Sequence, residues 1–206
     1  MLVALDNVGD SVLSSPLFKK WMGYVDDFNK KNPAKEESWF LILCSNYYDH
    51  DLGKSIDKAM KDPNTVEMAK LAEKERMKEW LEKWRYSPDH AFRSLKLNKV
   101  GEKVFLSPKF ELWVKYLDDW YKAFSSNKMT MIDGIRGNYH DLELVPMLAA
   151  AEKVPSTQKL ASQLQDALVD KWIAEKKTVA YLKGWLIRDA SSDEMLERFT
   201  TKLNGA

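Results

Sequence analysis

The chain contains an internal repeat with a period of 92 residues. The string "SPLFKKWMGYVDDF" at residues 15–28 returns as "SPKFELWVKYLDDW" at residues 107–120. The match extends without a gap, so that residues 1–81 align with residues 93–173. A duplication of this length predicts two copies of one structural unit, and any fold proposed for one copy must also suit the other.

Each copy of the repeated string has the spacing of a helix with one apolar face. Its apolar residues recur at intervals of three and four: Phe18, Trp21, Val25 and Phe28 in the first copy, and Phe110, Trp113, Leu117, Trp120 and Phe124 in the second. Because a helix turns once every 3.6 residues, Trp21 and Trp113 should both point into a core. A serine followed by a proline starts each helix, at 15–16 and 107–108, and the same pair stands at 87–88. Serine is a good N-cap and proline suits the first helical position.

The remainder of each copy is also predicted to be helical. Asp49 and Asp141 recur in phase, and each is expected to cap the helix that follows it. Long amphipathic helices are expected at about 65–84 and 156–176, each after a proline and each containing a repeated tryptophan, Trp80 or Trp172. No strand-like alternation bounded by hairpin turns is present. The sequence therefore predicts an all-α protein built from tandem helical-bundle repeats, with four or five helices in each unit.

Composition excludes several classes of function. The chain has 32 basic and 31 acidic residues among 206, which lacks the basic excess expected of a nucleic-acid-binding protein. No apolar run approaches the length of a membrane span. The single cysteine, Cys44, rules out an intramolecular disulfide, and its apolar neighbours favour a buried, inert thiol.

No catalytic or metal-binding pattern stands out. His50, His90 and His140 lie in polar contexts without a partner at ligand or triad spacing, and no P-loop, GxGxxG, HExxH or GxSxG motif occurs. We therefore expect no metal, no cofactor and no enzymatic activity. "EESWFLIL" at 36–43 has the shape of an autophagy-receptor ligand, and "EKVFL" at 102–106 resembles a phosphatase type 1 docking motif. Both are better explained as packed segments, since Met131, Ile132 and Ile135 keep the first segment apolar in the second copy.

The two in-phase strings, together with "SLKLNKVGEKVF" at 94–105, resemble the LWY modules of oomycete RXLR effectors. The resemblance covers essentially the whole chain and implies units stacked into an elongated rod. It implies that Trp21 and Trp113 are the core tryptophans of the W-box helices, each packed against a later Y-box aromatic, for which the matches are Phe92 and Tyr181. It also implies that an L-box forms the joint between units, here through Leu97, Val100, Val104 and Phe105.

This resemblance gives a first unit at 1–92, with a partial L-box at 1–14, and a second unit at 93–206 with a C-terminal helix. Two alignments of the second Y-box remain open, because "GWLIRDASSDEML" can also be matched directly to "EWLEKWRYSPDHAF". The signal peptide and RXLR region of the family are not visible in this chain. We therefore expect a fragment of a longer tandem array that the pathogen secretes and delivers into the host cell.

The resemblance implies a non-catalytic effector that binds a host plant protein and suppresses plant immunity, and we expect it to act as a monomer. Some members of this family use a pair of adjacent units to bind the scaffold subunit of the type 2A protein phosphatase. A different host target, or an enzyme with a cryptic site between units, are the alternatives. Because the aligned cores are alike, specificity should lie where the copies differ. We place the docking patch on the basic residues of the second unit, Lys128, Arg136, Lys171, Lys176 and Lys177.

Overall fold

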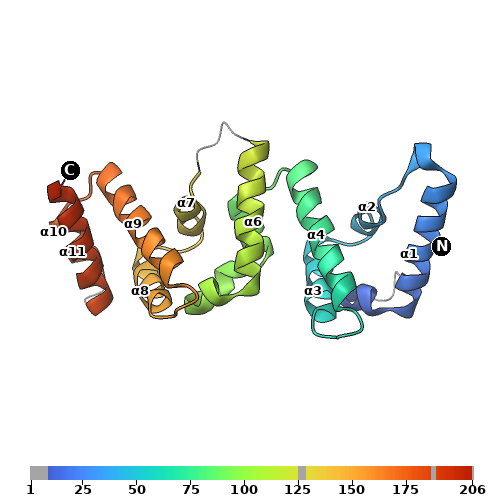
Figure 1. The fold of residues 1–206 in the computed structure, drawn as a ribbon, viewed down its shortest axis with the longest axis horizontal. Coiled ribbons are helices and arrows are strands. Elements are labelled where there is room, and N and C mark those ends of the chain that lie inside the picture. Colours follow the sequence, from blue (N-terminus) through green and yellow to red (C-terminus); the bar gives the residue numbers. More distant parts are fainter. Residues whose placement is uncertain (1–8, 125–128, 187–188, 206) are drawn as a thin grey trace. The chain divides into compact units, whose positions relative to one another are not determined.

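The computed structural model describes residues 9–124, 129–186 and 189–205, and every regular element in them is a helix (Figure 1). The chain divides into two compact units, residues 1–85 and 86–206. The all-α prediction is confirmed. The boundary lies seven residues before the expected one, since the helix that contains Phe92 packs within the second unit.

The first unit contains four α-helices and two short 3-10 helices in the part of it that the structure describes. They are η2 (Gly9–Ser14), α1 (Pro16–Lys31), η3 (Pro33–Lys35), α2 (Trp39–Cys44), α3 (Asp49–Ala59) and α4 (Val66–Glu82).

The second unit repeats these four α-helices and adds others before and after them. Its elements are α5 (Pro88–Ser94), η4 (Leu97–Lys99), η5 (Gly101–Leu106), α6 (Pro108–Ala123), α7 (Met131–Arg136), α8 (Asp141–Glu152), α9 (Gln158–Ala174), α10 (Val179–Trp185) and α11 (Ala190–Gly205). Helices α1 to α4 begin 92 residues before α6 to α9, one for one. The sequence repeat is therefore a repeat of structure, and the long helices α4 and α9 lie where they were expected.

Matching side-chain caps explain why the helices of the two units begin at equivalent positions. Ser15 and Ser107 each accept a hydrogen bond from the backbone N–H two residues later, both at 3.3 Å, and a proline occupies the first turn of each helix. Before the long helices, Thr65 Oγ1 donates to the carbonyl of Ala59 at 2.9 Å, and Thr157 Oγ1 donates to that of Ala151 at 2.7 Å. These bonds satisfy backbone groups that a helix end leaves without a partner.

The W-box tryptophans lie in the cores, as their spacing predicts. Trp21 is 6% exposed and Trp113 is fully buried. Trp113 packs edge-to-face on Phe92, with ring centroids 5.0 Å apart, and its indole N–H donates to the carbonyl of Pro88 at 2.7 Å. The expected pairing of Phe92 with Trp21 is therefore wrong, because helix α5 closes the core of the second unit.

The L-box segment also packs inside the second unit. Leu97, Val104 and Phe105 are buried, and η5 lies against α8. The hydroxyl of Tyr139 donates to the carbonyl of Leu97 at 2.6 Å and ties this segment to the start of α8. Val100 is 40% exposed, so the expectation that all four residues are buried fails at this position. In the first unit η2 packs against α3 in the same way.

Helices α10 and α11 complete the second unit. Tyr181, the expected Y-box aromatic, is 48% exposed and stacks on Trp185, whereas its neighbour Leu182 is fully buried. Thr178 caps α10 through the N–H of Tyr181, and the helix packs with its Leu182 face rather than its Tyr181 face against the core. Phe199 of α11 is fully buried with its ring 6.2 Å from that of Trp172.

Candidate protein-binding site

A polar cluster lies at the start of α8, within the second unit. Asp141 is 5% exposed and accepts hydrogen bonds from the indole N–H of Trp172 at 2.7 Å and from Arg136 Nε at 2.8 Å. The same guanidinium reaches Glu175 with its Nη1 at 2.6 Å. Asp141 was expected to cap α8, and this is wrong, because His140 is the N-cap and Asp141 points toward α9.

The ion pairs of this cluster stabilise the charged forms of their members. The hydrogen bond to Glu175 and, against the cost of burial, the bond to Asp141 raise the pKa of Arg136 above its ordinary value. The hydrogen bond from Arg136 lowers the pKa of Glu175 below the ordinary glutamate value. Arg136 therefore links α7, α8 and α9 of one unit.

The first unit builds an equivalent cluster with its arginine from a different helix. Asp49 accepts the indole N–H of Trp80 at 2.8 Å, and Arg76 of α4 makes a two-pronged contact with it at 2.8 Å through Nε and Nη2. Arg76 is 2% exposed and also contacts Glu73 at 3.4 Å. A Cβ added to Gly53 would lie 2.8 Å from Arg76 Nη2, so the absence of a side chain there makes room for the guanidinium.

The two units thus neutralise equivalent aspartates, Asp49 and Asp141, with arginines from different helices. The position of Arg76 is occupied in the second unit by the buried Leu168, and that of Arg136 is occupied in the first unit by Cys44. The positions of Gly53 and Glu73 change with them, to Val145 and Gln165. Arg76 on α4 needs the space that Gly53 leaves open. Leu168 on α9 is shorter, so Val145 can fill the equivalent space in the second unit. The residues at these four positions therefore differ together between the units. The differences are accounted for by packing inside each unit and do not mark a docking surface.

The expected docking residues therefore separate into two groups. Arg136 is bound by Asp141 and Glu175, and Lys171 pairs with Asp133 at 2.8 Å, so neither is the unengaged cation that the sequence suggested. Lys176 is exposed. Lys177 Nζ lies 4.5 Å from the ring centroid of Tyr181 and 4.0 Å from Glu175 Oε2, so its engagement is weaker than that of Arg136 but not absent. Lys128 lies outside the described residues.

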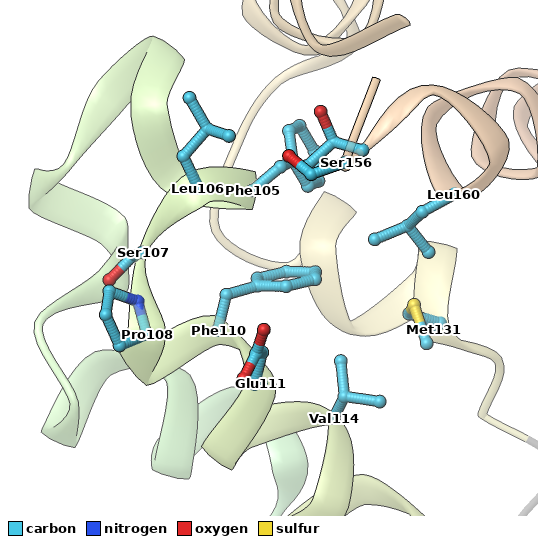
Figure 2. Close-up of a pocket in the computed structure, with 11 residues that line it drawn as sticks. Phe105, Leu106, Ser107, Pro108, Phe110, Glu111, Val114, Met131, Ser156 and Leu160 are labelled. Atoms are coloured by element: carbon cyan, nitrogen blue, oxygen red, sulfur yellow. The ribbon is translucent and has the colours of Figure 1, made fainter. Parts of the chain in front are cut away.

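A pocket of about 420 Å³ opens on the second unit at the start of α6 (Figure 2). Its lining is mostly apolar and comes from η5, α6, α7 and the start of α9: Phe105, Leu106, Ser107, Pro108, Phe110, Glu111, Val114, Met131, Ser156, Thr157 and Leu160. Figure 2 shows the ring of Phe110 at the centre of these residues, with Met131 and Leu160 to one side. Pockets of this size are of the order that binds small ligands or partner side chains. The sequence carries only an indirect signal for it, Met131 and Val114 in place of the larger Trp39 and Met22 at the aligned positions.

Reactive chemistry is scarce in the described residues. They contain no group of three or more side chains that could hold a metal ion, and none of their helices is long and apolar enough to cross a membrane. Cys44 is partly rather than fully buried, and desolvation raises the pKa of its thiol to about 12, which disfavours the reactive thiolate. Phe40 and Leu43 are buried, as are Val104 and Phe105, so both candidate ligand motifs are packed segments.

Comparison with known proteins identifies homologues of the chain. The chain is 43% identical over 198 residues to an RxLR effector protein of Phytophthora infestans, and the match covers 96% of this chain. It is 32% identical over 196 residues to the RxLR effector protein PSR2 of Phytophthora sojae. The chain is homologous to the RxLR effectors. No family model matches it.

The fold of this RxLR-effector homologue agrees with that relationship. The crystal structure of PcRxLR12 matches it with a TM-score of 0.77 and 29% identity, over 99% of this chain and 51% of that one. The chain spans 29% of the length of each of the two effectors named above. The homology therefore concerns only part of the length of these effectors.

Proposed function

We propose that this segment is a non-catalytic, host-protein-binding part of a pathogen effector that is secreted, delivered into plant cells and suppresses plant immunity. The observation that carries the proposal is the homology to RxLR effectors along 96% of the chain. The scarcity of reactive groups in the described residues supports binding over catalysis. We propose that the segment acts as a monomer.

We propose the scaffold subunit of the type 2A protein phosphatase as the partner. The support is the resemblance to effectors that bind this subunit through adjacent units, and this chain contains two such units. On the second unit, the exposed Lys176 and its neighbour Lys177 are the proposed contacts with acidic side chains of the scaffold.

The test is capture of the purified plant scaffold subunit by the purified chain, measured as a dissociation constant by surface plasmon resonance. Reversing Lys176 and Lys177 to glutamate should weaken capture and reduce its dependence on salt. The matched control reverses Lys19 and Lys20 on α1 of the first unit, which adds the same charge change elsewhere. Absence of capture by the folded wild-type chain would reject this partner, and substrate turnover by the chain alone would reject the non-catalytic assignment.

A further inference from the structure

The internal repeat supplies a comparison for the pocket over Phe110. The first-unit residue aligned with Met131 is Trp39, and each is the first residue of its short helix. The Trp39 ring packs edge-on against Phe18, the counterpart of Phe110, with centroids 6.0 Å apart. An aromatic ring therefore covers in the first unit the phenylalanine that lines the pocket in the second.

A second lining residue, Val114, is also smaller than its counterpart in the first unit. Met22 and Met68 pack with Trp39 against the core of the first unit, and their counterparts are Val114 and Leu160. Leucine and methionine have nearly equal volumes, but valine is smaller than methionine. The changes from Trp39 to Met131 and from Met22 to Val114 therefore remove volume beside the buried ring of Phe110, where the pocket lies, bordered by the half-exposed Leu106. The pocket therefore suits a ring in the position that Trp39 occupies in the first unit.

The charge of Glu111 limits which side chain could occupy the pocket. Glu111 is the charged residue among those that line the pocket, and in the first unit its position is occupied by Lys19. Glu111 is exposed in the first turn of α6 and makes no ion pair within the described part of the chain. A carboxylate beside an apolar pocket favours a ligand that carries a cation next to its ring.

We propose that this pocket receives an aromatic side chain of a partner protein, presented beside an arginine or lysine that pairs with Glu111. The proposal deepens the protein-binding function proposed above and rests on it. Burial of an aromatic ring in a formed pocket is a common source of binding energy in protein interfaces, where a few such side chains dominate.

The experiment measures binding of blocked dipeptides to the full chain by methyl NMR. The probes are acetyl-Trp-Arg-amide, acetyl-Trp-Glu-amide and acetyl-Ala-Arg-amide. We expect saturable shifts of the Leu106, Val114 and Leu160 methyl groups with the first peptide. We expect roughly two- to fivefold weaker binding of the second, the range for an exposed charge pair, and no saturation with the third.

The chain itself offers matched variants. Met131→Trp places in the second unit the residue that the first unit already accommodates, so it should fold and abolish the methyl shifts. Trp39→Met is the reciprocal control and should leave them unchanged. Glu111→Lys should remove the preference for the arginine-containing peptide while retaining binding of the ring.

Several outcomes overturn the proposal: no saturable shift with either tryptophan peptide, equal shifts with the alanine peptide, or binding unchanged by Met131→Trp. Shifts that depend on protein concentration and vanish in Met131→Trp would instead make a second copy of the chain the occupant. The same measurements distinguish failure of this pocket proposal from failure of the phosphatase-scaffold proposal. Peptide binding without capture of the phosphatase scaffold leaves the pocket assignment standing, and capture without peptide binding rejects the pocket alone.

Discussion

Replacement of Arg76 by leucine tests the polar cluster of the first unit most directly. The change removes the 2%-exposed cation and leaves Asp49 with the indole N–H of Trp80 as its remaining contact in the cluster. Glu73, 4% exposed at its side chain, loses the same partner. Breaking a buried ion pair by removing one member costs about 3–5 kcal/mol, because an uncompensated charge stays buried. Domains of this size have free energies of unfolding of about 5–15 kcal/mol, so the loss should be large for the unit concerned.

The second unit indicates how the loss can be repaired. Cys44→Arg supplies the cation from α2, as Arg136 does from α7. Gly53→Val, Glu73→Gln and Lys83→Glu, the last at the position aligned with Glu175, complete the arrangement. We expect the chain that carries these four changes together with Arg76→Leu to recover most of the lost stability. Gly53→Val alone should destabilise the unit, because its side chain would meet the guanidinium that lies 2.8 Å from an added Cβ.

Hydrogen exchange read by mass spectrometry is the suitable assay, since it reports on the amides of α3 and α4 separately from those of the second unit. The second unit serves as an internal control in each variant. A loss of stability in α3 and α4 of less than about 1 kcal/mol in Arg76→Leu, the scale of an exposed pair, would contradict the buried ion pair. A five-substitution chain no more stable than the single variant would contradict it as well.

Three further predictions concern the second unit. Trp113→Ala should cost about 3–5 kcal/mol, measured by urea denaturation, because it empties the site under Phe92 and removes a buried hydrogen bond; an unchanged midpoint would contradict the W-box assignment. Leu182→Ala should cost about 2–5 kcal/mol in the same assay, and Tyr181→Ala much less, since only the leucine is buried; the reverse order would restore Tyr181 as the Y-box residue. The lowered pKa of Glu175 means that its contribution to stability is present above the unfolded value near 4.5 and is lost as pH falls through the folded value. Glu175→Gln should therefore flatten the acid limb of the stability–pH curve, and an unaltered limb would refute the pairing with Arg136.

Local patterns in the sequence were sufficient for the helices and for much of the core. The inward position of Trp113 follows from a helical period, and the start of α6 follows from a serine–proline cap, so both depend on residues a few positions away. Tyr181 shows the limit of such reasoning. The alignment predicts an inward aromatic there, but Leu182 is the buried residue, because the packing of α10 against α11, a contact that local pattern does not contain, decides which side faces inward.

The candidate site was harder to predict because its contacts join distant segments. The sequence suggests a surface cation at Arg136, but Glu175, 39 residues away in the sequence, contacts it in the folded unit. The pocket depends on a difference in volume, Met131 in place of Trp39, which is visible in the aligned sequences but acquires meaning only when the ring of Phe18 is seen beneath Trp39.

Because the arginine comes from α4 in one unit and from α7 in the other, recombination between the two repeats can give stable products only at some crossover points. A crossover between the codons of α3 and α4 that joins the start of the first unit to the end of the second would encode Cys44 with Leu168, and its aspartate would have no arginine. The reciprocal product would encode Arg136 with Arg76, two cations beside one aspartate, and Val145 in place of the glycine that Arg76 needs. Both hybrids should be less stable than either parent, so viable exchanges should fall outside the interval from α2 to α4, where whole units are inherited together.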